Sequence, residues 1–191
     1  MVCSSVANLT ALAVAREVKL AGDMTDAVLY SSDQTHASNN KALKILGFRQ
    51  DQHRSVSTNS DFQLDLQVLN DLIARERSDG RRPFCVIANA GTTNTGAVDP
   101  LAELVKISKT NNMWIHVDGA FGAAAILTER GGNWLDGLGD VDSLSINPHK
   151  WLFQPFEIGC VLVKHVNDLK PLSRKNTYTC KTLTQPKSLA K

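Results

Sequence analysis

The feature that most constrains the fold is a set of short apolar runs in which apolar and polar residues do not alternate. The longest are "PFCVIANAG" at 83–91 and "MWIHVDGAF" at 113–121. A strand that is apolar on both faces is typical of a parallel sheet covered by helices on each side. Segments with helical spacing of apolar residues separate the runs. The pattern predicts an α/β fold, a mostly parallel sheet flanked by helices, with strands at 27–32, near 48–51, and at 83–91, 113–121, 142–147 and 159–165.

Four helical segments are expected between these strands, and their ends carry recognisable signals. Ser4 and Ser5 stand just before the first helix as capping groups, and Asp65 is a candidate cap for the third. Asp99 and Pro100 give the fourth helix a strong start. The expected helices cover 7–20, 36–46, a stretch from 66 that ends before Gly80, and a stretch from about 101.

Composition narrows the class of protein. A length of 191 residues suits one sizeable domain, and a net charge of +2 gives no reason to expect a nucleic-acid or membrane surface. The apolar stretch at 9–20 contains three charged residues, which excludes a membrane span there. The four cysteines have no paired spacing, which argues against a zinc site or a disulfide framework: Cys3, Cys85, Cys160 and Cys180. We therefore expect a cytoplasmic protein with reduced thiols and no metal.

Several polar residues fall at the carboxyl ends of the expected strands, where ligands bind in open α/β sheets. Ser4 and Ser5 open the first helix, where free backbone N–H groups favour an anion such as phosphate; ordinary capping is the simpler alternative. His36 follows the strand at 27–32, and taken alone it reads as a surface histidine. Thr92 and Thr93 follow a turn of small residues that lets backbone approach a ligand.

The stretch "SINPHKWLFQP" at 145–155 places a lysine next to large apolar groups. Asn147 and His149 precede Lys150 at the end of an expected strand. Partial burial among apolar side chains would lower the pKa of an amine and make it nucleophilic. Asp118 ends the run "WIHVD" and is expected to be partly buried, where a carboxylate needs a cationic partner; a cap on the following turn is the alternative.

Together these positions supply a phosphate cup, a carboxylate, a planar histidine and an activated lysine at one sheet edge. Pyridoxal 5'-phosphate is the cofactor that needs this set. Its aldehyde forms a Schiff base with a lysine, its ring nitrogen needs an acidic partner and its phosphate needs an anion site.

Five stretches resemble the pyridoxal-phosphate-dependent group II amino-acid decarboxylases, which include aromatic-L-amino-acid, tyrosine, histidine and glutamate decarboxylases. They are "ANLTAL", "YSSDQTHAS", "NAGTTNTGAVDPL", "WIHVDGAFG" and "INPHKWLFQPFEIGC". The similarity extends from about Ser4 to Lys164, and "PHKWL" together with "HVD" and "DQTH" is highly specific. The resemblance implies the large domain of the aspartate-aminotransferase type (fold type I) with about seven strands. It also implies an amino-acid substrate and, for a full-length member, a homodimer.

The resemblance assigns roles residue by residue. Lys150 resembles the Schiff-base lysine, Asp118 the partner of the pyridine nitrogen, and His36 the imidazole stacked on the cofactor ring. These three are the expected catalytic residues. The other expected cofactor-binding residues are Ser4, Ser5 and Asn147 at the phosphate, Thr93 in the cofactor site, Ala120 against the ring face and His149 before the lysine.

The chain departs from the family pattern near both ends. Val6 stands where members usually have a glutamate, and Met1 falls almost on the expected phosphate cup. Residues 1–170 are expected to form a partial large domain and 171–191 a poorly ordered tail, in which Tyr178 is only near the place of a mobile-loop tyrosine. These departures predict a truncated chain with little or no catalytic activity.

Decarboxylation of an amino acid is the leading functional hypothesis, and only the family resemblance favours it over transamination. One alternative is another enzyme of the same cofactor class, such as an aldehyde synthase or a lyase. A second alternative is a catalytically silent protein that keeps the core sheet.

Overall fold

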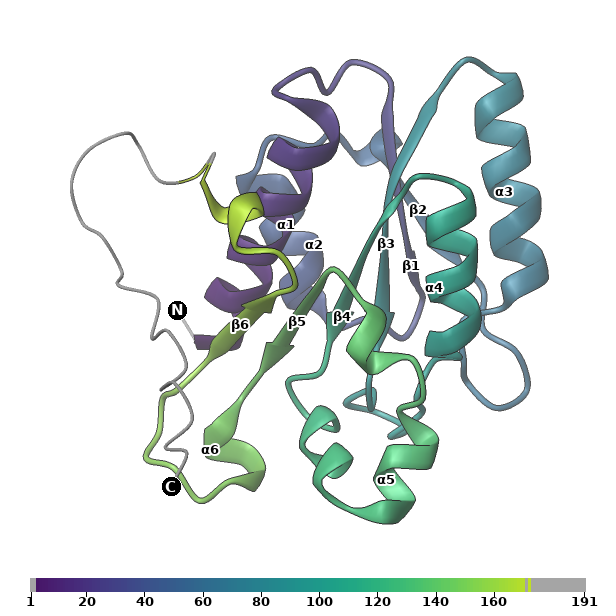
Figure 1. Ribbon diagram of the computed structural model, residues 1–191. Coiled ribbons are helices and arrows are strands. Elements are labelled where there is room, and N and C mark those ends of the chain that lie inside the picture. Colours follow the sequence, from purple (N-terminus) through teal and green to yellow (C-terminus); the bar gives the residue numbers. More distant parts are fainter. Residues whose placement is uncertain (1–2, 171, 173–191) are drawn as a thin grey trace, which may run out of the picture.

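Six strands form one sheet in the computed structural model, which describes residues 3–170 and 172 (Figure 1). Their order across the sheet is β2-β1-β3-β4-β5-β6. Neighbouring strands pair in parallel, except that β6 runs antiparallel to β5. The predicted mostly parallel sheet is confirmed, with six strands in the described part of the chain where the resemblance implied about seven. The strands are β1 (Ala27–Ser32), β2 (His53–Val56), β3 (Arg82–Asn89), β4 (Trp114–Asp118), β5 (Ser143–Ile146) and β6 (Cys160–Val163).

Helices cover both faces of the sheet. Helices α1 and α2 pack on one face and α3 and α4 on the other (Figure 1). Helix α5 was not predicted, because its six residues "ERGGNW" contain two glycines and no apolar period. Within the described residues, no helix combines the length and apolarity needed to cross a bilayer. The helices are α1 (Cys3–Leu20), α2 (Ala37–Ile45), α3 (Leu66–Ser78), α4 (Leu101–Thr110), α5 (Glu129–Trp134) and α6 (Pro148–Trp151).

Strand β1 shows why the apolar runs do not alternate. Val28 and Tyr30 belong to the core cluster that includes α3 and α4 residues, whereas Ala27 and Leu29 belong to the cluster that includes α1 and α2 residues. All four side chains are fully buried. Because successive side chains point to opposite faces, a strand between two helical layers must be apolar at every position.

Two local predictions need correction. The strand expected near 48–51 begins only at His53, because residues 50–52 form a 3₁₀ turn in which the Arg49 N–H donates to Gln52 Oε1 over 2.9 Å. Ser4 and Ser5 lie inside the first turn of α1, which already begins at Cys3, and not before it.

The signals for the third and fourth helices have different outcomes. Asp65 does cap α3, since its carboxylate accepts from the N–H groups of Gln67 and Val68. Asp99 does not cap α4. Its carboxylate accepts from the N–H groups of Leu64 and Asn89, both over 2.7 Å, and so ties the end of β3 to the segment before α3.

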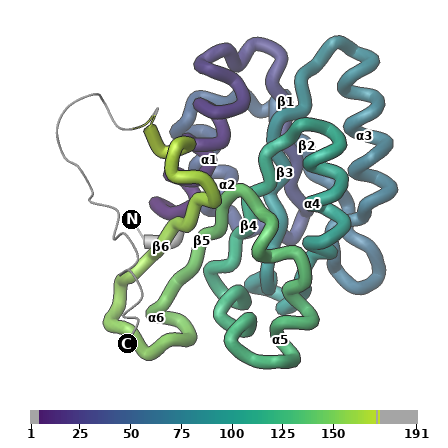
Figure 2. The backbone as a smooth tube through the Cα atoms, viewed as in Figure 1, coloured from purple at the N-terminus to yellow at the C-terminus, as the bar shows by residue number. Residues whose placement is uncertain are grey.

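The parallel strands bring their carboxyl ends to one edge of the sheet. The loops that follow β1, β3, β4 and β5 meet there, and α5 and α6 lie at the same lower edge of the molecule (Figure 2). The tail expected at 171–191, including Tyr178 and Cys180, lies outside the described residues except for Leu172.

Candidate active site

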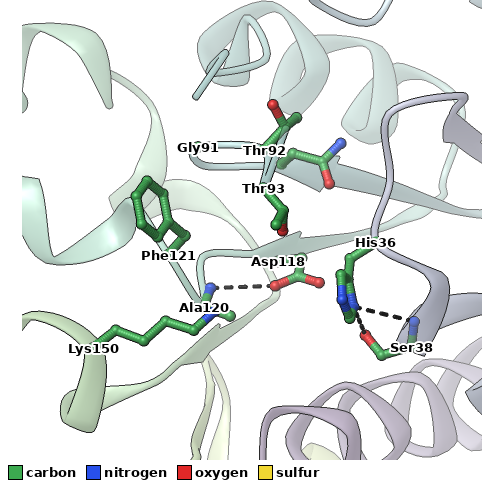
Figure 3. Close-up of a pocket in the computed structure, with 10 residues that line it drawn as sticks. His36, Ser38, Gly91, Thr92, Thr93, Asp118, Ala120, Phe121 and Lys150 are labelled. Carbon is green, nitrogen blue, oxygen red and sulfur yellow. Dashed lines mark hydrogen bonds between the residues drawn. The ribbon is translucent and has the colours of Figure 1, made fainter. Parts of the chain in front are cut away.

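A cleft opens at the carboxyl edge of the sheet (Figure 3). It brings together five of the predicted site residues from four different segments of the chain. They are His36, Thr93, Asp118, Ala120 and Lys150. The remaining lining residues are Ser38, Asn89, Gly91, Thr92 and Phe121.

Asp118 ends β4 and is only 7% exposed. Its Oδ2 accepts from the side-chain amides of Asn8 and Asn39, both over 2.8 Å. Its Oδ1 accepts from the Ala120 N–H over 3.2 Å and the Ser145 hydroxyl over 3.3 Å. The Ala120 contact is the turn cap considered from the sequence. Within the described residues, Asp118 forms no ion pair with a lysine, arginine or histidine, so the expected cationic partner is not found there.

A buried row of side chains lies behind Asn8. His116 Nε2 is 3.1 Å from Asn8 Oδ1, and His116 Nδ1 is 3.0 Å from Ser143 Oγ. The Trp114 indole N–H donates to the same Ser143 oxygen over 2.8 Å. Complete burial lowers the pKa of His116 to about 4, an effect that the negative charge of Asp118 opposes only in part. The imidazole is therefore neutral at neutral pH.

His36 is held by the first turn of α2. It is the N-cap residue, and its Nδ1 accepts from the Ser38 N–H over 3.2 Å and lies 2.8 Å from the Ser38 hydroxyl. The ring is exposed on the cleft side. The histidine therefore has a fixed position at the cleft, which the sequence position alone did not indicate.

Lys150 lies in α6, a single helical turn that follows β5 and has Pro148 at its first position. Its Nζ is 6.0 Å from the centroid of the Phe121 ring, and its side chain extends toward the segment that carries Asp118 and Ala120 (Figure 3). The expectation of partial burial was wrong. Lys150 is exposed, because the apolar residues after it are exposed as well, and Phe153 is 100% exposed.

The turn of small residues after β3 allows its backbone to approach the backbone of the loop after β4. Gly91 has a φ of +86°, and a Cβ at this position would lie 2.9 Å from the Gly122 Cα. The loops after β3 and β4 can therefore approach only because both residues lack side chains. This approach leaves Thr92 buried and places the exposed Thr93 on the cleft.

Three predicted cofactor-binding residues are not among the described residues that line the cleft: Ser5, Asn147 and His149. The side chain of Ser4 lies outside the described part of the chain. The start of α1 nevertheless lies near this edge, since Asn8 contacts Asp118 at the end of β4. Asn147 is buried as the N-cap of α6. His149 Nδ1 lies 2.8 Å from the Ile158 carbonyl oxygen and 3.1 Å from the Ile158 nitrogen, and its ring packs edge-on against Phe156.

Sequence reasoning missed the amide side chains around Asp118. Asn8 precedes the buried Leu12 by four residues, and Asn39 precedes the buried Leu43 by four, so each lies on the apolar stripe of its helix. A polar residue on such a stripe is the signal that could have identified both.

The residues at the cleft fit the ring of a pyridoxal phosphate. A buried carboxylate that forms no ion pair with residues 3–170 matches a protonated ring nitrogen, and an exposed imidazole and an exposed primary amine lie at the same cleft.

Comparison with known proteins agrees with this chemistry. Residues 4–186 match the pyridoxal-dependent decarboxylase conserved domain. The chain is 50% identical over 161 residues to an aromatic-L-amino-acid decarboxylase of Bacillus atrophaeus, a match that covers 84% of this chain and 34% of that protein.

Two solved structures have the same fold. Oryza sativa TDC with PLP and tryptamine superposes with a TM-score of 0.86 at 30% identity, over 95% of this chain and 39% of that one. Rhodiola rosea 4-hydroxyphenylacetaldehyde synthase superposes with a TM-score of 0.83 at 35% identity, over 88% of this chain and 38% of that one. The chain spans about a third of the length of the curated relatives it matches. With this site, this fold and a family match over most of its length, the chain belongs to the pyridoxal-dependent decarboxylase family.

Proposed function

We propose that this chain is the cofactor-binding part of a pyridoxal-phosphate-dependent amino-acid decarboxylase, in which residues 1–170 form part of the large domain. One observation carries the proposal. The buried Asp118 carboxylate forms no ion pair with any residue of the described part of the chain, and it lines the same cleft as the exposed amine of Lys150. When bound, pyridoxal phosphate supplies the electron sink that loss of carbon dioxide from an amino acid requires.

Three residues at the cleft have different proposed roles. Lys150 Nζ is the amine that would hold the cofactor through its aldehyde. Asp118 would hold a proton on the ring nitrogen. Four hydrogen bonds keep its carboxylate in place for this role. His36, whose position Ser38 fixes, would hold the face of the cofactor ring.

The remaining predicted residues are proposed to hold the rest of the cofactor. Thr93 and Ala120 line the cleft beside the ring position. Ser4, Ser5 and Asn147 are proposed at the phosphate, and His149 beside it. The direction of α1 supports this placement, because its first turn lies at the carboxyl edge of the sheet and the free N–H groups of a helix start attract phosphate.

Aromatic amino acids are the first substrates to test, because the relative at 50% identity is an aromatic-L-amino-acid decarboxylase. Conversion to an aldehyde is the second candidate, since relatives also include a 4-hydroxyphenylacetaldehyde synthase at 40% identity. A silent chain that binds cofactor without turnover is the third.

We also propose a cytoplasmic location and a homodimer for the whole protein. The free thiols of Cys85 and Cys160 support a reducing compartment. The exposed apolar side chains around α6 support a covered face in an assembly, and Trp151, Phe153 and Phe156 are the largest of them.

The test adds pyridoxal phosphate to the purified chain and follows visible absorbance, then adds aromatic amino acids and separates the products. New visible absorbance with release of amine and carbon dioxide supports decarboxylation, and release of aldehyde supports the second candidate. Absorbance without product supports the silent chain. Absence of new absorbance at saturating cofactor contradicts the proposed cofactor site.

A further inference from the structure

A buried row of hydrogen-bonded side chains runs from Trp114 to Asp118, and the groups at its two ends fix which atoms donate along it. The Trp114 indole nitrogen can only donate, and an ionised carboxylate can only accept. Between them stand Ser143, His116 and Asn8, each of which can donate and accept. All five side chains are at most 7% exposed, so bulk water does not substitute for a missing partner.

The direction can be derived one atom at a time. Asn8 must present its NH₂ group to Asp118 Oδ2, which places Asn8 Oδ1 against His116. An amide oxygen only accepts, so His116 Nε2 carries the proton. Because the imidazole is neutral, His116 Nδ1 is bare and accepts from the Ser143 hydroxyl, whose oxygen in turn accepts from Trp114. Every donor in the row therefore points toward the carboxylate.

We propose that His116 is a positioning residue for Asp118. Its Nε2–H tautomer holds the Asn8 amide in the orientation that donates to Asp118 Oδ2. Asp118 Oδ1 is then left for the occupant of the cleft. The distances support this division. The two donors to Oδ2 lie at 2.8 Å, whereas those to Oδ1 lie at 3.2 and 3.3 Å, so Oδ1 is the less strongly bound oxygen.

The same amide reaches a second group at the cleft. Asn8 Nδ2 also donates to the Ser38 hydroxyl over 3.3 Å, and that hydroxyl lies 2.8 Å from His36 Nδ1. A flipped Asn8 amide would put its oxygen against both the Asp118 carboxylate and the Ser38 oxygen. The tautomer of one buried histidine thus fixes the orientation of Asp118 and His36, which the proposed function places at the nitrogen and at the face of the cofactor ring.

The first test needs no cofactor. Long-range ¹H–¹⁵N correlation spectra of the 191-residue chain identify which imidazole nitrogen of each histidine is protonated, and loss of the signal in His116→Gln assigns His116. We expect a protonated Nε2 and a bare Nδ1 from pH 7.5 down to 5.5. A protonated Nδ1, or an imidazolium at pH 7, overturns the proposal.

The second test uses two variants that differ only in which ring nitrogen they imitate. The amide of His116→Gln can reach the position of Nε2 and donate to Asn8, whereas that of His116→Asn reaches only the position of Nδ1, beside Ser143. The measurement is the dissociation constant of pyridoxal phosphate from an absorbance titration, with circular dichroism to show that each variant is folded. We expect His116→Asn to bind roughly tenfold more weakly than the wild type, and His116→Gln within about threefold of it.

The positioning role of His116 in catalysis rests on the proposed function, but the outcomes of the two tests distinguish a failure of the one from a failure of the other. Equal affinity in both variants and the wild type, or equal weakening in both, overturns the positioning role while leaving Lys150 and the cofactor in place. A wild-type chain that binds no cofactor contradicts the proposed function, and the tautomer spectra then still decide the direction of the row.

Discussion

The two sides of the cleft are built differently. On one side, Asp118 receives four hydrogen bonds and stands in front of a row of buried side chains that reaches Trp114. On the other side, Lys150 is exposed on a single helical turn, and the apolar residues that follow it are exposed too. The comparison shows that folding of the sheet is enough to fix the position of the Asp118 carboxylate, whereas it is not enough to fix the position of the Lys150 amine.

The largest effect on stability is expected from Asn8→Ala, which removes the side chain that links Asp118 to His116. The change removes a donor from a buried carboxylate and leaves the proton on His116 Nε2 without an acceptor. We expect the free energy of unfolding to fall by roughly 3 kcal/mol in urea denaturation. Thr10→Ala on the same helix, where only a bond to the Val6 carbonyl is lost, is the control and should cost less than about 1 kcal/mol. Similar losses in both variants would contradict the comparison.

A graded effect is expected from pH, and over any single pH unit it is smaller than the loss from Asn8→Ala. His116 has a pKa of about 4 in the folded chain, below its ordinary value of 6.5, because burial disfavours the imidazolium. The unfolded chain therefore binds more protons between these values, so stability is full above pH 6.5 and falls as the pH drops toward 4. The slope from this residue is roughly 1.4 kcal/mol per pH unit.

The control for this slope is His116→Gln, because burial also lowers the pKa of His53 and gives a slope of the same sign. Urea denaturation between pH 7 and 4.5 should show a shallower dependence in the variant than in the wild type. Identical dependence in the two proteins would show that His116 is not the titrating group.

The smallest effect is expected on the Lys150 side. Phe153→Ser removes a large apolar side chain that is 100% exposed, so the free energy of unfolding should change by less than about 0.5 kcal/mol. Light scattering of the same samples sharpens the point, since a more polar α6 segment should lower self-association. A loss of about 3 kcal/mol or more, the cost of truncating a buried aromatic side chain, would mean that the segment is packed.

The same contrast explains how far sequence reasoning reached. The parallel sheet and both helical layers followed from apolar runs. The strand-end rule brought four of the lining residues to one edge, His36, Thr93, Asp118 and Lys150, whereas Ala120 was named only through the family resemblance. Asp118 was expected to be buried because its strand is apolar, and it is.

The misses have physical causes of their own. Lys150 was expected to be shielded by the apolar residues after it, but local sequence does not show whether those residues pack against the chain. The partners of Asp118 were also missed, because Asn8 and Asn39 come from helices 110 and 79 residues away. Long-range hydrogen bonds leave only an indirect trace, a polar residue on an apolar helical stripe.

The most direct test of the cofactor site is to locate the covalent bond. The chain is incubated with pyridoxal phosphate and reduced with borohydride, and the labelled peptide is identified by mass spectrometry in the wild type and in Lys150→Ala. Because Lys150 is exposed, the variant should be as stable as the wild type, so lost labelling reports on chemistry and not on folding. The proposed site predicts label on Lys150 in the wild type and none in the variant. Label on another lysine, or label that persists in Lys150→Ala, would contradict it.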